Sequence, residues 1–444
     1  MDEMIFPADN VNCPADDVNI PADNIELLAP AGNFQKMETA FLYGADSVYL
    51  GGEAFGLRAN AGNFTADEIR KAAKLANSLG KHIYVTVNIL ARNDDVPLIR
   101  EYVGELCDAG VHGLIVSDIG IFLMIRELYP DMPLHVSTQA NNLNYKTAEF
   151  WFRNGASRLN LARELSLQEI KVINGKLLEA MPELGSRKEP VLEAFVHGAM
   201  CMAYSGRCML SDYLAGRSSN RGDCAQPCRW KYYISEEQRP GEYFQVEESD
   251  RGTFLFNSKD LAMIRYLPEL LSSGVRALKI EGRMKSEFYL ATVVKAYRTA
   301  IDAYRKNPQG YSADTALLGY LDNEIGSCSH REYSTGFYFG GKGSQIYSSS
   351  SYIRNTDYLG CVKSCRELPS GKYKIVLIQK GPFREGESLE FLTPDNAEPV
   401  RLTISELKDS AGLPQKRAGV PMDEYSFLSD SFVSAGSMLR RVNR

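Results

Sequence analysis

Short apolar segments alternate with longer amphipathic segments eight times between residues 25 and 305 of this 444-residue chain. An alternation of this kind predicts a parallel sheet covered by helices, and eight units favour a closed (β/α)8 TIM-like barrel in the α/β class. No GxGxxG motif follows the first apolar segment, which argues against a dinucleotide-binding fold. The predicted strands are 25–30, 47–50, 82–88, 113–117, 134–137, 157–162, 191–198 and 277–282, and the predicted helices include 67–80, 95–109, 119–129, 145–154, 261–273 and 286–305.

The segments on either side of this pattern differ from it in composition. Residues 1–24 repeat a PADN-like motif three times and carry little to bury, so we predict a disordered tail. Residues 328–444 contain short apolar runs separated by turn residues, which predicts a small antiparallel β-barrel module. The predicted barrel domain lies between them, at residues 25–310.

Composition limits the partners of the chain. Its 44% hydrophobic and 24% charged residues are typical of a globular protein, and the net charge of −6 excludes a broadly basic surface. No apolar run is long enough to span a membrane, and the acidic start lacks the features of a secretory signal, so we expect a cytoplasmic protein without membrane contact. Residues 328–444 contain 16 Lys and Arg against 13 Asp and Glu, which leaves either a solvated β surface or an RNA-facing one open.

Four of the nine cysteines lie in the long connection between the seventh and eighth predicted strands. Cys201, Cys208, Cys224 and Cys228 have the spacing C-x6-C-x15-C-x3-C within the predicted insertion 199–253. Thiolates bind zinc or iron–sulfur clusters, and the wide first pair favours a cluster over structural zinc. Chance clustering of buried cysteines remains the alternative. Because βα loops carry the active sites of such barrels, we expect the cysteines to lie over the barrel mouth.

Polar residues recur at the carboxyl ends of the predicted strands. Alternation places Glu193 and His197 on one face of the seventh strand, and Lys279 and Glu281 on one face of the eighth. We take His197, Lys279 and Glu281 as candidate catalytic residues. Glu193 joins the candidate substrate-binding residues, which are Arg58, Asn60, Asn88, Ser117, Gln139, Asn160, Glu193 and Arg283. Arginine binds carboxylates and phosphates bidentately, so an anionic ligand is expected.

Several segments together resemble the collagenase-like peptidase family of unassigned catalytic type. They are ELLAPAG, ADSVYLGG, FGLRANAGNF, EAFVHGAMCMAYSGRCMLS, NRGDCAQPCRW and LKIEGRMKS. The branch most similar to this chain acts in tRNA hydroxylation. The resemblance implies a [4Fe–4S] cluster held by Cys201, Cys208, Cys224 and Cys228. It also implies prephenate as co-substrate and 5-hydroxyuridine at the wobble position as product.

The leading hypothesis is therefore an oxygen-independent tRNA uridine hydroxylase that binds the anticodon loop and draws on an unidentified electron donor. One alternative is a collagenase-like peptidase that uses a Cys–His pair or a metal. The chain has no HExxH or GxSxG motif, but His197 lies four residues before Cys201. Hydroxylation of another RNA or of a quinone precursor, and a non-catalytic RNA-binding scaffold with a structural metal, are further alternatives.

Overall fold

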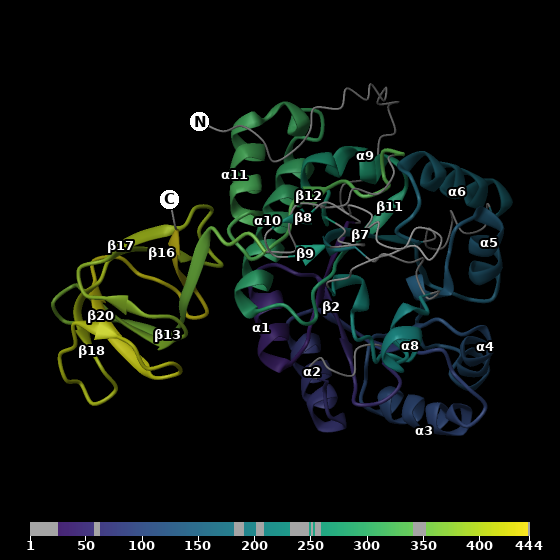
Figure 1. Ribbon diagram of the computed structural model, residues 1–444, viewed down its shortest axis with the longest axis horizontal. Coiled ribbons are helices and arrows are strands. Elements are labelled where there is room, and N and C mark those ends of the chain that lie inside the picture. The colour runs from purple at the N-terminus through teal and green to yellow at the C-terminus, as the bar shows by residue number, and fades with distance from the viewer. Residues whose placement is uncertain are drawn as a thin grey trace, which may run out of the picture.

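The computed structural model describes residues 25–56, 63–181, 191–200, 208–230, 248–249, 252–253, 259–340 and 352–442. The predicted tail, Arg58, Asn60 and Cys201 lie outside these residues. Two bodies are visible, a barrel and a smaller curled sheet beside it (Figure 1). No helix among the described residues is long and apolar enough to cross a membrane.

Eight parallel strands close the barrel, as predicted. Each strand pairs with the next, and pairing of β11 with both β7 and β1 closes the ring. Their bounds are β1 Glu26–Pro30, β2 Ser47–Gly51, β3 His82–Val87, β4 Gly113–Val116, β5 Leu134–Val136, β6 Arg158–Asn160, β7 Val191–Ala199 and β11 Val275–Ile280.

The helices form the outer layer of the barrel, and most start at a side-chain cap. Thr65 and Ser166 form capping boxes with Glu68 and Glu169, which satisfy the free N–H groups at the starts of α2 and α6. The helices are α1 Phe34–Leu42, α2 Ala66–Ser78, α3 Asp95–Asp108, α4 Ile119–Leu128, α5 Tyr145–Arg153, α6 Leu167–Ala180, α9 Leu267–Ser272, α10 Glu287–Lys306 and α11 Thr315–Ile325.

The helix predicted over 261–273 is wrong in its first half. Residues Asp260–Ala262 form β10, which pairs antiparallel with the end of β7, and β12 (Tyr333–Ser334) extends the same sheet. The helix α9 starts later, with Pro268 in its first turn. Pairing with a long neighbouring strand therefore overrides the local helical periodicity.

The lumen of the barrel has two unlike halves. Leu28, Tyr49, Tyr84 and Ile115, from β1 to β4, form a buried cluster separate from the main core. The main core fills the space between the strands and the outer helices. Charged side chains from β6, β7 and β11, together with Glu26 of β1, occupy the rest of the lumen.

The C-terminal body is an antiparallel curled sheet with its own hydrophobic core, as predicted. Its strand order is β17-β16-β21-β13-β14-β20-β18, and β15 pairs with β19 as a separate ribbon. The bounds are β13 Thr356–Glu367, β14 Tyr373–Gln379, β15 Phe383–Arg384, β16 Ser388–Leu392, β17 Val400–Thr403, β18 Ser405–Lys408, β19 Arg417–Ala418, β20 Glu424–Ser429 and β21 Met438–Val442.

Buried polar contacts join the two bodies on the β16–β21 side. Arg440 of β21 forms a buried ion pair with Glu324 of α11, with an N–O distance of 2.8 Å. The hydroxyl of Tyr43 donates to the carbonyl oxygen of Leu392, and the rings of Phe288 and Tyr358 stack. These contacts hold the curled sheet against α1, α10 and α11 (Figure 1).

Candidate active site at the barrel mouth

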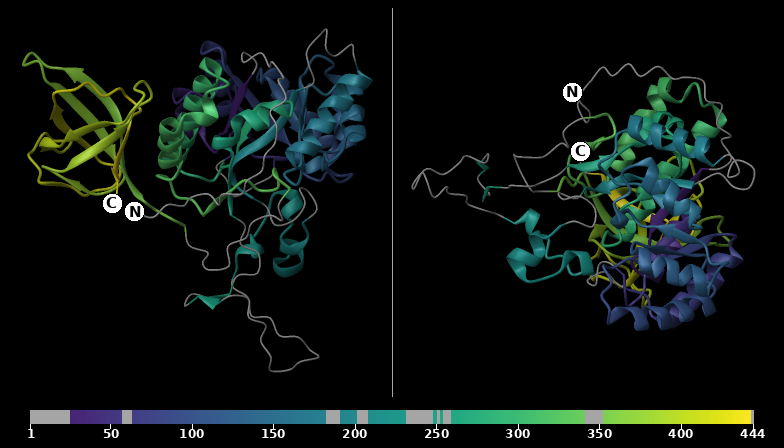
Figure 2. Two further views of the ribbon diagram at one scale, coloured as in Figure 1. Left: turned by 90° about the horizontal axis from the view of Figure 1, so that it is seen from above. Right: turned by 90° about the vertical axis from the view of Figure 1, so that its right-hand side faces the viewer.

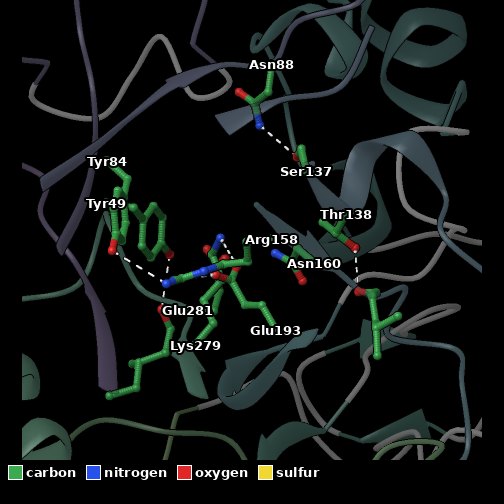
Figure 3. Close-up of polar contacts among 12 residues, drawn as sticks. Tyr49, Tyr84, Asn88, Ser137, Thr138, Arg158, Asn160, Glu193, Lys279 and Glu281 are labelled. Carbon is green, nitrogen blue, oxygen red and sulfur yellow. Dashed lines mark hydrogen bonds and ion pairs between the residues drawn. The ribbon is translucent and has the colours of Figure 1, made fainter. Parts of the chain in front are cut away.

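A closed network of four charged side chains, Glu26, Arg158, Glu193 and Lys279, lies inside the barrel, and Figure 3 labels the last three. Lys279 Nζ donates to Glu193 Oε1 at 2.8 Å, and Arg158 Nη1 donates to Glu193 Oε2 at 3.2 Å and to Glu26 Oε1 at 3.1 Å. Two carboxylates and two cations balance, as buried charges require. Burial raises the pKa of Glu26, but the charge of Arg158 and the hydrogen bonds from Arg158, Ser47 and Tyr84 together outweigh it, so this pKa lies below its usual range.

Aromatic rings complete the surroundings of these charges. Lys279 Nζ lies 4.5 Å from the centre of the Tyr49 ring, and the Arg158 guanidinium lies 5.0 Å from that of Tyr84. His135 packs edge-on against Tyr84 at 4.4 Å. Burial, and then the charges of Arg158 and Lys279, hold the pKa of His135 well below its usual range, so this imidazole is neutral at pH 7.

Amides and hydroxyls at the carboxyl ends of β3 to β6 form a second group, which we call the polar ring and define as Thr86, Asn88, Ser117, Ser137, Asn142 and Asn160. Asn88 Nδ2 donates to Ser137 Oγ at 3.2 Å, and Ser117 donates to the carbonyl oxygen of Asn88. Asn142 Nδ2 donates to the backbone of Ser137 and Asn160.

Three atoms of the polar ring are buried without a hydrogen-bond partner among the described residues. They are Thr86 Oγ1, Asn142 Oδ1 and Asn160 Oδ1. A buried polar atom without a partner costs about 1–3 kcal/mol, so a ligand or water that supplies one is favoured. The ring can therefore accept hydrogen bonds from a polar molecule.

An ion pair that the sequence analysis missed lies beside this ring. Arg163 Nη2 donates to Glu281 Oε2 at 3.2 Å, and its guanidinium stacks 3.8 Å from the centre of the Phe195 ring. Arg163 follows β6 and Glu281 follows β11, so the pair spans β7. Arg163 lies in a loop, where strand alternation gives no signal of its direction.

Arg283 is buried against two glycines near the starts of the first loops. A Cβ atom at Gly51 would lie 2.2 Å from Arg283 Nη1, and one at Gly32 would lie 2.1 Å from the carbonyl oxygen of Arg283. Glycine at both positions makes room for this arginine at the end of β2. Gln139, another predicted binding residue, is half-buried in the 3-10 helix Thr138–Ala140.

His197 lies apart from the polar ring. Its ring centre is 5.2–5.9 Å from those of Tyr289, Tyr297 and Tyr333. The pairing of β7 with β11 shifts register between Phe195 and His197, so the alternation that places Glu193 and Phe195 beside Lys279 does not extend to His197. Burial lowers the pKa of His197 to about 3.

Residues 208–230 are the described part of the predicted insertion, which we call the cysteine segment. They dock on the loop after β3. Asn220 and Arg221 exchange hydrogen bonds with the backbone of Leu90, and Arg221 forms an ion pair with Asp95 at 2.8 Å. This segment contains α8 (Leu210–Ala215) and projects from one end of the barrel (Figure 2). Its contact with Leu90 places it at the carboxyl ends of the strands, where the barrel mouth lies.

Cys208, Cys224 and Cys228 form no disulfide within the described residues. The backbone N–H of Gln226 donates to Cys224 Sγ at 3.4 Å, a contact that stabilises thiolates in metal centres. Within the described residues no three His, Cys, Asp or Glu side chains come together as a metal site, and the predicted ligand set also needs Cys201. The donor chemistry of the segment fits a thiolate-bound metal centre.

The mouth therefore brings together Asn88, Ser117 and Asn160 in the polar ring, Glu193 with Lys279 in the network below, and Glu281 with Arg163 beside them. Sequence reasoning missed Glu26 and Tyr49, although each is a polar side chain within a predicted barrel strand. A charged or hydroxyl-bearing side chain within a buried strand needs a partner in the lumen.

Comparison with known proteins identifies relatives along nearly the whole chain. The model of peptidase family U32 matches residues 32–348, and that of the family's C-terminal domain matches residues 354–440. The chain is 37% identical to tRNA hydroxylation protein P1 of Bacillus subtilis, over 94% of both chains. It is 34% identical to tRNA hydroxylation protein P of Escherichia coli, over 87% of this chain and 90% of that one.

A third relative carries a different activity in its name. The collagenase of Porphyromonas gingivalis is 32% identical over 76% of this chain and 79% of its own. These matches confirm the resemblance that the sequence motifs indicate. The chain belongs to peptidase family U32.

Proposed function

We propose that this protein hydroxylates uridine at the wobble position of tRNA to 5-hydroxyuridine, with prephenate as co-substrate and without molecular oxygen. The observation that carries the proposal is the 37% identity, over 94% of both chains, to a tRNA hydroxylation protein. The C5–H bond of the base becomes C5–OH while the C–OH bond of prephenate becomes C–H, so prephenate supplies the hydroxyl group and accepts the two electrons that the base loses.

The polar ring is the proposed site of the base. An enzyme that modifies a base must take it out of its stack, and an anticodon loop offers unstacked bases. A uracil ring presents an N3–H donor, and Thr86 Oγ1, Asn142 Oδ1 and Asn160 Oδ1 are acceptors without partners among the described residues. Asn88 and Ser117 lie beside them, and Gln139 lies in the adjoining 3-10 helix.

Prephenate carries two carboxylates, so its site needs cations. The guanidinium of Arg283, which lies against Gly51 at the end of β2, is the proposed contact among the described residues. Arg58 and Asn60, which follow β2 in the sequence, are proposed as further contacts. Lys279 and Glu281 each have a partner already, so their proposed role is to set the electrostatic potential of the mouth. His197, enclosed by three tyrosine rings, is poorly placed to be the catalytic base.

Cys201, Cys208, Cys224 and Cys228 are the proposed ligands of a [4Fe–4S] cluster. Such a cluster, when bound, supplies one-electron transfer. The docking of Asn220 and Arg221 against Leu90 holds the cysteine segment beside the polar ring. The proposed electron donor, a separate protein or small molecule, would reduce the cluster before the reaction.

The experiment that tests this function is gene deletion followed by mass spectrometry of tRNA nucleosides from cells grown with and without oxygen. We expect 5-hydroxyuridine derivatives at the wobble position to fall in anaerobic cells, and a plasmid copy to restore them. A copy with Asn160→Ala should restore less, while one with the exposed Lys176→Ala should restore fully. Unchanged levels in a strain without paralogues would refute the proposal.

Proteolysis is the second candidate, because a collagenase is 32% identical to this chain. A peptidase based on Cys201 and His197 would release peptides from gelatin and lose this activity on His197→Ala. If the purified protein cleaves gelatin at a rate that depends on both residues, the peptidase function replaces the hydroxylase function.

A further inference from the structure

The curled sheet has an outer face that the barrel does not cover. Ile375, Leu377 and Phe427 point into its core, so the residues that alternate with them on β13, β14, β20 and β18 point outward. This outer face is defined by Ser364, Arg366, Lys374, Val376, Ser405, Lys408, Ser426 and Leu428. It belongs to the end of the sheet away from β16 and β17 (Figure 1).

Two cations stand directly opposite each other on this face. Arg366 of β13 and Lys374 of β14 are register partners in the antiparallel ladder. Like charges in directly opposite positions destabilise a sheet, whereas opposite charges would stabilise it. Neither side chain forms an ion pair with any described residue, so nothing in that part of the chain offsets the repulsion.

The charge around the pair is also unbalanced. Lys408, which pairs in register with Ser426, adds a third cation to the face without an ion pair in the described chain. The carboxylate next in sequence, Glu367, pairs with Tyr373, and alternation turns it to the opposite face. By contrast Lys363, at the other end of the face, is bound to Glu424.

Small side chains lie beside the cations. Ser364 is exposed and precedes Arg366 by one alternation, whereas Ser426 is buried and the Ser405 hydroxyl donates to the carbonyl oxygen of Leu428. Because serine side chains are short, an extended chain of phosphates can approach the cations, and the Ser364 hydroxyl can donate to a phosphate oxygen. Three cations without ion pairs in the described chain, beside an exposed hydroxyl, fit the backbone of a nucleic acid.

We propose that this outer face binds the sugar–phosphate backbone of the tRNA at a part distant from the anticodon loop. This inference rests on the proposed function, because it takes tRNA as the substrate. The buried Arg440–Glu324 pair and the Tyr43 contact fix the curled sheet against the barrel by its opposite side. A base in the mouth and phosphates on the outer face are thus two contacts of one long RNA, and the second adds affinity without reading sequence.

The test is the affinity of the full-length chain for radiolabelled full-length tRNA and for its anticodon stem-loop alone, between about 50 and 200 mM salt. In the variant Arg366→Ala/Lys374→Ala, we expect affinity for full-length tRNA to fall about tenfold or more. The slope of log K against log salt should decrease by about 2, one for each lost phosphate contact. Affinity for the stem-loop should not change.

A matched control exists in the same body. Arg384 of β15 and Arg417 of β19 are also register partners and lack ion pairs in the described chain, but Asp409 and Asp423 line the same pocket as Arg417 and lower its local potential. Arg384→Ala/Arg417→Ala removes the same charge and should change tRNA affinity less than twofold. Both double variants should fold, because each removes a repulsion.

Three results would overturn the inference: no loss with Arg366→Ala/Lys374→Ala, an equal loss for the stem-loop, or an equal loss in the control. The measurement is independent of hydroxylation. If gene deletion leaves 5-hydroxyuridine unchanged while the outer face still binds tRNA, the proposed function fails and the surface assignment stands. If hydroxylation is confirmed and the variant binds tRNA normally, the surface assignment alone fails.

Discussion

Glu193 is the residue whose loss should most disturb the barrel, because it is the only described carboxylate bonded to both Arg158 and Lys279. The variant Glu193→Gln keeps the size of the side chain and removes its charge. The network then holds two buried cations against the single carboxylate of Glu26. We expect a large loss of stability from this one change.

The magnitude follows from the burial of the partners. The side chains of Glu193, Lys279 and Arg158 are 2%, 5% and 6% exposed, so solvent screens their interaction weakly. Unit charges about 4 Å apart interact by about 4 kcal/mol at an effective dielectric constant of about 20. Removing one partner of a buried pair costs about 3–5 kcal/mol, and we expect Glu193→Gln to lower the free energy of unfolding by this amount.

The assay is urea unfolding followed by circular dichroism at pH 7, with two companion variants. Glu193→Gln/Lys279→Met restores the charge balance and should recover at least half of the loss. Lys176→Met breaks the exposed pair with Glu179 and should hardly change the free energy of unfolding. The reasoning is refuted if Glu193→Gln costs as little as Lys176→Met, or if the effects of the Glu193 and Lys279 substitutions simply add.

Three further predictions follow from other contacts. The pKa of His197 is about 3 in the folded chain and near 6.5 when unfolded, so its contribution is complete above pH 6.5 and is lost as pH falls toward 3. Between pH 7 and pH 5, the free energy of unfolding of His197→Phe should therefore fall by about 2 kcal/mol less than that of the unchanged protein, measured by urea unfolding at both pH values. Arg221→Ala removes the ion pair with Asp95, and limited proteolysis should cut the cysteine segment faster, whereas Arg217→Ala, whose partner Asp223 lies within the segment, should not change its docking. Cys224→Ala should abolish the brown colour and iron content of anaerobically purified protein, and Cys365→Ala, in the curled sheet, should not; colour that survives Cys224→Ala would contradict the ligand assignment.

The order of the barrel strands could be predicted from sequence because each is a short apolar run that is buried on both faces. The run Leu134–Val136, for example, pairs with both neighbours and is fully buried. Asp260–Ala262 could not be assigned in this way, since its pairing partner on β7 is some sixty residues away in the chain. Non-local pairing decided that segment, and local periodicity carries no information about it.

The site was predictable only where a regular strand fixes the direction of a side chain. Lys279 and Glu193 meet because both lie on regular parts of β11 and β7, but the register shift beyond Phe195 sends His197 to the tyrosines. Arg163 and Asn142 lie in loops after β6 and β5, where alternation does not apply. Within the polar ring, Asn88, Ser117 and Asn160 could therefore be predicted from their strands, whereas Asn142 is known only from its contacts.

The charged network and the polar ring are separate groups of side chains in the barrel, and this separation affects how the site would work. The Glu26, Arg158, Glu193 and Lys279 network is closed, since each charge has its partner and the sum is zero. A substrate that replaced one of these partners would have to break a buried ion pair, at a cost of about 3–5 kcal/mol. The polar ring carries unpaired acceptors and no charge, so a neutral base can enter it without that cost. Binding of the base should therefore depend on the polar ring. The charged network should act through the rigidity and the electrostatic potential that it gives to the lumen. Kinetics can separate these roles: Asn160→Ala should raise KM for tRNA more than it lowers kcat, whereas Lys279→Met/Glu193→Gln should leave KM nearly unchanged.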